Sequence, residues 1–164
     1  GSKLRKVKNS VCSACYALKG NYTRYKNIKI AQYRRLAAIK LEGWTRAMAA
    51  QILRQKYFRW HDAGDVQDLD HLNKIYQVCE LTPDVKHWMP TREAWIKKHL
   101  DRKPANLVIR FSPPMIGQRN DSWPNSSMVV ETGATCPAPD QNNSCGSCRQ
   151  CWDPEIKVVS YGKH

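Results

Sequence analysis

Strand-like and helix-like segments alternate between residues 57 and 162, and this alternation limits the folds that the chain can adopt. Runs of aromatic and β-branched residues predict strands at 57–61, 85–92, 106–113, 127–133 and 156–162. Apolar residues at helical spacing predict helices over 67–81 and 93–103, between the first three strands. Because strands that alternate with helices pair in parallel, we expect an α/β fold. Five or six strands are too few for a closed eight-stranded barrel, so an open or partial (β/α) barrel is predicted.

The chain is expected to form a single domain over residues 3–164, with Gly1 and Ser2 set aside as a cloning remnant. The domain divides into a basic N-terminal third at 3–59, a βα core at 57–133 and a cysteine-rich metal-binding segment at 134–164. No apolar run approaches the ~18 residues of a membrane span, and no apolar stretch follows the basic start as in a secretory signal. We therefore expect a cytoplasmic protein that has no membrane partner.

Two helices are predicted within the basic third. The first, over 27–41, carries apolar residues on more than one side, so we expect it to be largely packed. One side of this helix combines positive charge with an aromatic ring and could face phosphate, and its residues are Lys26, Lys29, Tyr33 and Lys40. Gly43 is expected to end this helix, and Thr45 is the predicted N-cap of a second helix over 45–56.

Positive charge is concentrated in the first third of the chain. The net charge is +13, and residues 1–59 hold 15 Lys and Arg against the single acid Glu42, whereas 60–164 are close to neutral. Such an asymmetry predicts an anionic partner, of which nucleic acid is the commonest. Tyrosines interleaved with the cations could stack on the bases of a single strand. The predicted nucleic-acid contacts are Lys6, Lys8, Lys19, Arg24, Lys26, Lys29, Arg34 and Arg35, with Tyr22 and Tyr25.

Six of the seven cysteines gather near the two ends of the chain. They are Cys12 and Cys15 at one end, and Cys136, Cys145, Cys148 and Cys151 at the other. Because disulfides are rare in the cytoplasm and thiolates are soft ligands, such clusters indicate a metal site. The C-x2-C-x2-C spacing of the last three favours a [4Fe–4S] cluster over zinc, although two separated C-x2-C pairs for zinc are also present. The seventh cysteine, Cys79, lies on an apolar helix face and is predicted to be a core residue.

Six cysteines exceed the four ligands that one zinc ion or one cubane cluster needs, so the ligand set stays open at this point. A set drawn from both ends, such as Cys12 and Cys15 with two of the C-terminal cysteines, would fasten an open sheet end to end. The free energy of metal binding would then contribute to folding. The alternative set is wholly local and consists of Cys136, Cys145, Cys148 and Cys151.

The sequence "HDAGD" places His61, Asp62 and Asp65 after the first predicted strand. In α/β folds, sites are built at the carboxyl ends of strands, so these three are the candidate catalytic residues, as a divalent-metal site or as acid and base. The other reading is structural, in which Asp62 or Asp65 caps the next helix or holds the turn and His61 packs in the sheet. The neighbouring strand ends are expected to direct further side chains to this rim, namely Thr91, Arg92, Arg110 and Ser112. His61, Arg92 and Arg110 could together hold an anion.

Four pieces of the chain resemble the phage "gene product 88" family. They are "CSACYALKGNY", "FRWHDAGDV", "CPAPDQNNSCGSCRQCW" and "VVSYGKH". The resemblance implies a phage protein acting inside the infected host cell, and it supplies no reaction. In addition, "VCSACYA" is similar to the last two thirds of the radical SAM motif Cys-x3-Cys-x2-Cys, with Lys8 at the position of the first cysteine. Together they imply a trimmed, radical-SAM-like partial barrel in which Cys12 and Cys15 follow the first strand and the C-terminal cysteines complete the cluster.

These observations support three hypotheses about function. The first is a phage-encoded iron–sulfur protein, with a [4Fe–4S] cluster, that binds nucleic acid through its basic N-terminal region. The second is a radical-SAM-like or metal-dependent nucleic-acid-processing enzyme. The third is a zinc-stapled interaction module that acts on a host protein.

Overall fold

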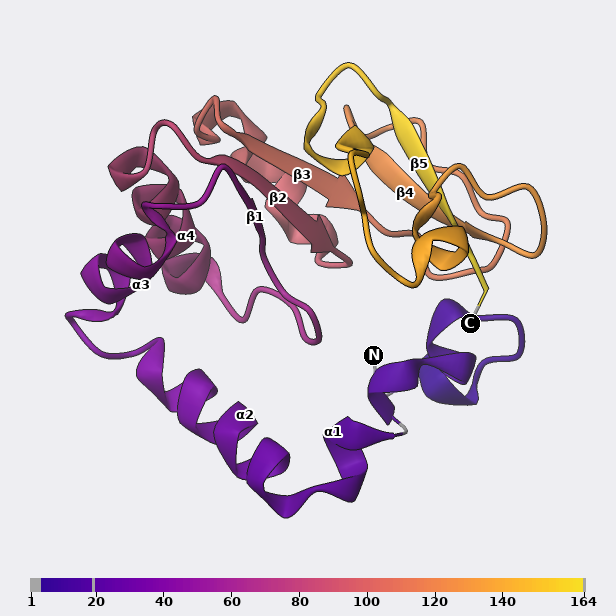
Figure 1. The fold of residues 1–164 in the computed structure, drawn as a ribbon, viewed down its shortest axis with the longest axis horizontal. Coiled ribbons are helices and arrows are strands. Elements are labelled where there is room, and N and C mark those ends of the chain that lie inside the picture. Colours follow the sequence, from indigo (N-terminus) through magenta and orange to yellow (C-terminus); the bar gives the residue numbers. More distant parts are fainter. Residues whose placement is uncertain (1–3, 19, 164) are drawn as a thin grey trace.

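The computed structural model describes residues 4–18 and 20–163, so Lys19 lies outside the described residues. Its centre is a single sheet of five parallel strands in the order β1-β2-β3-β4-β5. The strands are β1 (Tyr57–Arg59), β2 (Lys86–Thr91), β3 (Leu107–Phe111), β4 (Ser126–Val130) and β5 (Val158–Gly162). The sheet curls into a half-barrel (Figure 1). The predicted α/β class and the partial barrel are therefore confirmed, and all five predicted strands exist with boundaries shifted by a few residues.

Helices and 3-10 turns make up the remaining regular structure. The N-terminal elements are η1 (Leu4–Lys6), η2 (Val11–Ala14), η3 (Tyr16–Leu18), α1 (Asn21–Arg24), α2 (Lys26–Ala38) and α3 (Trp44–Ile52). The later ones are α4 (Leu69–Leu81), η4 (Ala94–Arg102), η5 (Ala138–Gln141) and η6 (Gln150–Trp152). Of these, α4 connects β1 to β2 and η4 connects β2 to β3, as βα units require.

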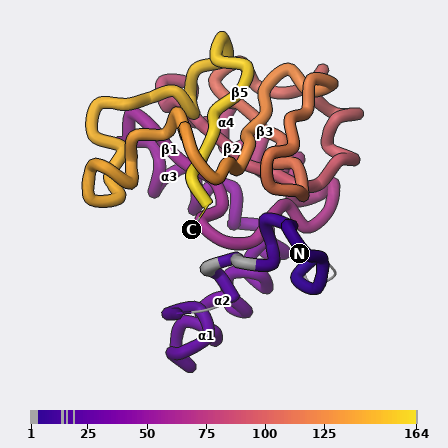
Figure 2. The backbone as a smooth tube through the Cα atoms, turned by 90° about the vertical axis from the view of Figure 1, so that its right-hand side faces the viewer, coloured from indigo at the N-terminus to yellow at the C-terminus, as the bar shows by residue number. Residues whose placement is uncertain are grey.

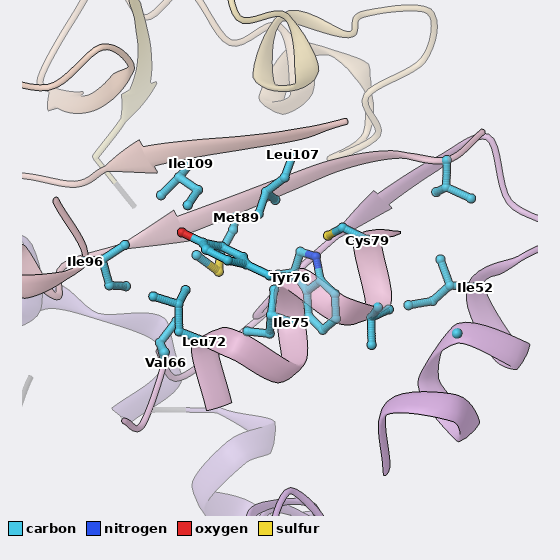
Figure 3. Packing of buried hydrophobic residues seen from close by; sticks show 14 of the residues in the cluster. Ile52, Val66, Leu72, Ile75, Tyr76, Cys79, Met89, Ile96, Leu107 and Ile109 are labelled. Atoms are coloured by element: carbon cyan, nitrogen blue, oxygen red, sulfur yellow. The ribbon is translucent and has the colours of Figure 1, made fainter. Parts of the chain in front are cut away.

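The main core lies between α4 and one face of the sheet. Asp68 caps α4 by accepting a hydrogen bond from the His71 backbone N–H at 2.8 Å, which fixes where the helix begins. The apolar stripe of α4 then packs against strand residues such as Met89 and Ile109 (Figure 3). Cys79 is completely buried in this core, as its position on the apolar face predicted.

The opposite face of the sheet is covered by the cysteine-rich segment. Successive residues of a strand point to opposite faces, so Trp88 points away from the α4 side to which Met89 belongs. Trp88 and Val159 pack there with Cys151 of η6. The Trp152 indole N–H donates to the Phe58 carbonyl at 3.0 Å and ties η6 to β1. The half-barrel therefore has helices on one face and the cysteine-rich segment on the other.

The sheet is weakest between β3 and β4. These strands share one register pair, Phe111 with Ser126, whereas β2–β3 and β4–β5 each pair over five positions. The Phe111 N–H extends the joint by donating to the Asn125 carbonyl at 3.2 Å. The Asn125 side chain in turn donates to the carbonyls of Pro154 and Ile156, just before β5. Loop side chains thus replace much of the missing strand pairing.

The prediction of a largely packed first helix was wrong. In the structure α2 has no buried residue, and it lies away from the sheet in both views (Figures 1 and 2). The physical reason is that its apolar residues are not gathered into one stripe, so no single face can bury them together. Ile30, Tyr33 and Leu36 are all exposed, with Tyr33 at 64%.

Two further N-terminal expectations were also wrong. Gly43, and not Thr45, is the N-cap residue of α3, and Thr45 is buried inside the first turn of that helix. From Leu4 to Cys12 the described residues form no strand, because residues 4–18 form 3-10 turns and one isolated antiparallel bridge between Ser10 and Met115. The Ser10 hydroxyl accepts from the Ser13 N–H and starts η2, so the polar residues of this stretch favour a capped turn over extended pairing.

Candidate metal centre

Four cysteines line one pocket on the face of the sheet opposite to α4. They are Cys136, Cys145, Cys148 and Cys151, and the pocket also contacts Pro137, Ala138, Gln150, Trp152 and Val159. The cavity that these residues enclose is small, about 20 Å³, and opens partly to solvent. Cys151 is buried, Cys136 and Cys148 are half-buried, and Cys145 is exposed. The structure thus brings together the local set of thiols.

Backbone hydrogen bonds fix the positions of these cysteines. The Cys136 N–H donates to the Ser160 carbonyl of β5 at 2.9 Å, so Cys136 is fixed to the sheet. The Cys148 N–H donates to the Cys145 carbonyl at 2.9 Å and closes the turn of this C-x2-C pair. Gly146 adopts a positive φ of 51° within this turn, and a Cβ there would lie only 2.6 Å from the Gln141 amide oxygen. The positive φ therefore favours glycine at this point between the two cysteines.

Arg110 holds the cysteine-rich segment from inside the sheet. Its side chain is completely buried on β3 and donates five hydrogen bonds, all of them to backbone carbonyls. The acceptors are the carbonyls of Cys151, Ser126, Ile156, Gln150 and Asp153, at 2.7–3.5 Å. Because the Ser126 carbonyl belongs to β4, this one guanidinium links β3, β4 and the turn that carries Cys151.

The charge of Arg110 is the main electrostatic feature of the pocket. Burial lowers its pKa, while Tyr161, Cys151 and Asp153 act in the opposite direction. Among the residues that the structure describes, none of the side-chain ion pairs includes Arg110. A buried cation is costly unless negative charge lies nearby. Thiolates in the adjoining pocket would provide that charge.

Tyr161 contacts the thiol pocket from β5. Its hydroxyl lies 3.1 Å from the Cys151 sulfur, within hydrogen-bonding distance. Burial raises the pKa of the Cys151 thiol, whereas the Tyr161 hydrogen bond and the Arg110 charge oppose this rise. Burial also raises the pKa of Tyr161 well above its usual value, so its hydroxyl keeps the proton that it can donate to sulfur. A hydroxyl donor and a nearby cation are the outer contacts that stabilise metal-bound thiolates.

The donor set fits a thiolate-bound metal, but its present geometry is looser than a completed coordination sphere. Within residues 4–18 and 20–163, no three His, Cys, Asp or Glu side chains lie close enough together to hold one metal ion. Zinc would draw four sulfurs to about 3.8 Å from one another, given Zn–S bonds near 2.3 Å. In a [4Fe–4S] cluster each thiolate binds a different iron, so the sulfurs stay farther apart. Both groups take four thiolates, so the cysteines around the pocket supply the donors for either one.

Cys12 and Cys15 lie elsewhere, at the carboxyl end of β2. The pocket lining described above includes neither of them. The Arg92 guanidinium donates to the Cys12 sulfur at 2.9 Å, and the Val11 N–H donates to the Pro114 carbonyl after β3 at 2.8 Å. The structure therefore does not bring the ligand set drawn from both ends into one pocket.

Asp65 of the "HDAGD" sequence clamps the end of β2. Its carboxylate accepts hydrogen bonds from the Thr91 hydroxyl at 2.7 Å, the Arg92 N–H at 2.7 Å and the Val66 N–H at 2.8 Å. Burial raises its pKa, and these three hydrogen bonds counteract the rise. The expected meeting of Asp65 with Thr91 and Arg92 at one rim is confirmed. The expectation for Arg110 was wrong, because its side chain points to the cysteine-rich segment on the face opposite to α4.

His61 and Asp62 make separate contacts beside this clamp. The His61 ring packs edge-on against the His71 ring, with centroids 5.8 Å apart, and burial lowers its pKa to about 4. Asp62 accepts a hydrogen bond from the Tyr22 hydroxyl and lies 4.0 Å from the Arg59 guanidinium. These contacts suit the structural reading of "HDAGD" as a turn that joins α1, β1 and β2.

The predicted nucleic-acid residues are mostly exposed. Those with exposed side chains are Lys6, Lys8, Arg24, Tyr25, Lys26, Lys29, Arg34 and Arg35. Tyr22 is half-buried and engaged with Asp62, and Lys19 lies outside the described residues. Lys40, expected on the phosphate-facing side, forms an ion pair with Asp68 at 2.6 Å. The exposed cations therefore concentrate on α2 and the segments before it.

Sequence reasoning missed Tyr161 and placed Arg110 at the wrong rim, whereas both contact Cys151 beside the pocket. An arginine in the middle of an otherwise apolar strand was a usable signal, because a central strand position buries its side chain on either face. Tyr161 follows the alternation of β5 on the same face as Val159, two positions earlier.

The fold and the pocket define the chain as a small parallel α/β half-barrel with a thiol-lined pocket on the face that carries no helix. A family model described as "Gene product 88" matches residues 6–122. The chain therefore belongs to the gene product 88 family, which confirms the family expected from its sequence. The matched range holds Cys12, Cys15 and the "HDAGD" turn and stops before β4, so it does not include the four-cysteine pocket. No curated protein and no solved structure matches the chain.

No helix among the residues that the structure describes is both long and apolar enough to cross a membrane.

Proposed function

We propose that this protein is an iron–sulfur protein that holds a [4Fe–4S] cluster on Cys136, Cys145, Cys148 and Cys151. The observation that carries the proposal is the set of four thiols in one pocket beside the buried Arg110, which belongs to none of the ion pairs among the described residues. A bound cluster would supply a redox-active centre of net negative charge. Arg110 would compensate that charge, and Tyr161 would donate a hydrogen bond to the sulfur of Cys151.

The test is metal analysis of protein purified without oxygen. We expect about four irons and four sulfides per chain, since a cubane takes four thiolates. Cys136→Ser and Cys148→Ser should each lose most of this iron, whereas Cys12→Ser and Cys15→Ser, as matched cysteine controls, should keep it. A content of about one zinc per chain would instead indicate a structural zinc site. Protein that binds neither metal would overturn the proposal.

We further propose that α2 binds single-stranded nucleic acid. The supporting observation is a helix with no buried residue that exposes Lys26, Lys29, Arg34 and Arg35 together with Tyr33. A helix that buries nothing gains no stability from the core, and its cations are free to neutralise phosphates while tyrosines stack on bases.

Salt-dependent binding of a labelled oligonucleotide tests this second part. Removal of two cations in a Lys26→Gln, Lys29→Gln double variant should weaken binding and reduce the slope of log K against log salt by about 1–1.5. The matched control is Lys97→Gln with Lys98→Gln, which removes the same charge from exposed positions on η4. Equal losses in both double variants, or affinity that does not change with salt, would contradict the proposal.

A further inference from the structure

The two N-terminal cysteines lie one 3-10 turn apart. The Cys15 N–H donates to the Cys12 carbonyl at 3.4 Å, which is the i to i+3 bond of this turn. In such a turn the side chains at i and i+3 eclipse, and their Cα atoms are about 6 Å apart. A disulfide needs a Cα separation of about 4.4–6.8 Å. The backbone thus already holds Cys12 and Cys15 at a distance that a disulfide can span.

Arg92 contacts one of the two thiols. Its guanidinium donates to the Cys12 sulfur at 2.9 Å, and Cys12 is only 8% exposed whereas Cys15 is more accessible. The guanidinium therefore places a positive charge directly against the Cys12 sulfur. Asp65 fixes the position of Arg92 through its backbone N–H, which leaves the guanidinium free to reach sulfur.

We propose that Cys12 and Cys15 form a redox-active dithiol that exchanges with disulfide substrates. The site uses none of the four thiols of the proposed cluster pocket and does not depend on the cluster. Cys15, the more exposed, attacks a disulfide and releases one thiolate, which leaves a mixed disulfide on Cys15. The Cys12 thiolate then attacks the Cys15 sulfur and releases the second thiolate. Two electrons pass to the substrate disulfide, which becomes two thiols, and Cys12 and Cys15 become a disulfide.

The sequence offers a direct readout of this exchange. Trypsin cuts after Lys8 and Lys19 and releases the peptide 9–19, in which Cys12 and Cys15 are the two cysteines. The reduced protein is mixed anaerobically with glutathione disulfide, quenched by alkylation at successive times and digested. We expect this peptide to lose two hydrogens as its internal disulfide forms. The Cys12→Ser variant should instead accumulate one glutathione on Cys15.

Arg92 variants test the role of the guanidinium. In Arg92→Gln we expect the mixed disulfide to persist and its resolution to slow by about tenfold, because the resolving sulfur loses its cationic partner. Arg92→Lys should recover part of the rate. Both keep the backbone N–H that binds Asp65, so the clamp on β2 is retained. The control is Arg119→Gln, an exposed arginine paired with Asp121, which should resolve as the natural protein does.

Three results would overturn the proposal. One is peptide 9–19 that stays reduced while exposed Cys145 forms glutathione adducts. Another is an unchanged resolution rate in Arg92→Gln. The last is a loss of bound metal in Cys12→Ser or Cys15→Ser, which would make these residues ligands. The proposed cluster fails separately, by the metal content of the Cys136→Ser and Cys148→Ser variants.

Discussion

At the scale of single residues, Arg110 is the one on which most of the candidate site depends. In Arg110→Met the carbonyls of Gln150, Cys151 and Asp153 lose their buried donor, so the free energy of unfolding should fall by at least about 3 kcal/mol. Urea denaturation measures this change, and metal analysis should show a parallel loss of iron. Arg119→Gln, on an exposed ion pair, should change stability by less than about 0.5 kcal/mol. A stable, iron-loaded Arg110→Met protein would show that the hydrogen bonds from Arg110 to the backbone carbonyls are dispensable.

Buried histidines predict how stability depends on pH. Burial lowers the pKa of His61, His71 and His87 from 6.5 to about 4, so the unfolded chain binds more protons between these values. The free energy of unfolding should therefore fall as the pH falls through this window, by at most about 1.4 kcal/mol per pH unit for each histidine. Denaturation of the Cys136→Ser protein at about pH 7.5 and pH 5 measures the fall without metal release. His87→Gln should reduce it, and an identical fall in that variant would contradict the assignment to His87.

At the scale of elements, α2 should be far less protected than α4. An isolated helix of this length is marginally stable in water, and α2 buries none of its residues, whereas α4 buries six. We expect α2 amides to exchange within seconds and α4 amides to exchange with the slowest amides of the protein. Hydrogen-exchange mass spectrometry tests this, and a saturating oligonucleotide should slow exchange in α2 alone. Slow exchange in free α2 would indicate a packing partner within the chain.

The elements also show where sequence reasoning succeeded. The five strands and the parallel class were predictable, because strand-like and helix-like runs follow a local rule. The failure at α2 and the misplacement of Arg110 have one cause. A sequence pattern tells which side of an element is apolar, but it does not tell what covers that side. The four-cysteine set was available as an alternative, and choosing it required knowing that the last segment returns over the sheet.

At the scale of the whole molecule, removal of the proposed cluster should affect one side of the sheet. The cysteine-rich segment packs on Trp88 and Val159, while the helix-side core contains none of the four pocket cysteines. Chelation under reducing conditions should therefore change tryptophan fluorescence, because Trp88 and Trp152 would become exposed to solvent. The helical circular dichroism should stay nearly unchanged. The unfolding free energy should drop by several kcal/mol, because metal binding contributes to folding. Complete loss of helix on chelation would show that the two faces fold as one unit.

The narrow joint between β3 and β4 has a consequence for a cut chain. The loop between these strands exposes Gln118 and Arg119, and one register pair crosses the joint, whereas Arg110 donates to five carbonyls beyond it. Trypsin cleavage after Arg119 should therefore give two fragments that elute together on gel filtration and separate only in denaturant. After mixing and dilution, the natural fragments should reassemble, whereas an N-terminal fragment with Arg110→Met should not. If the reassembled pair also binds the proposed cofactor, fragment complementation would directly measure how much the hydrogen bonds of Arg110 contribute to holding the two parts together.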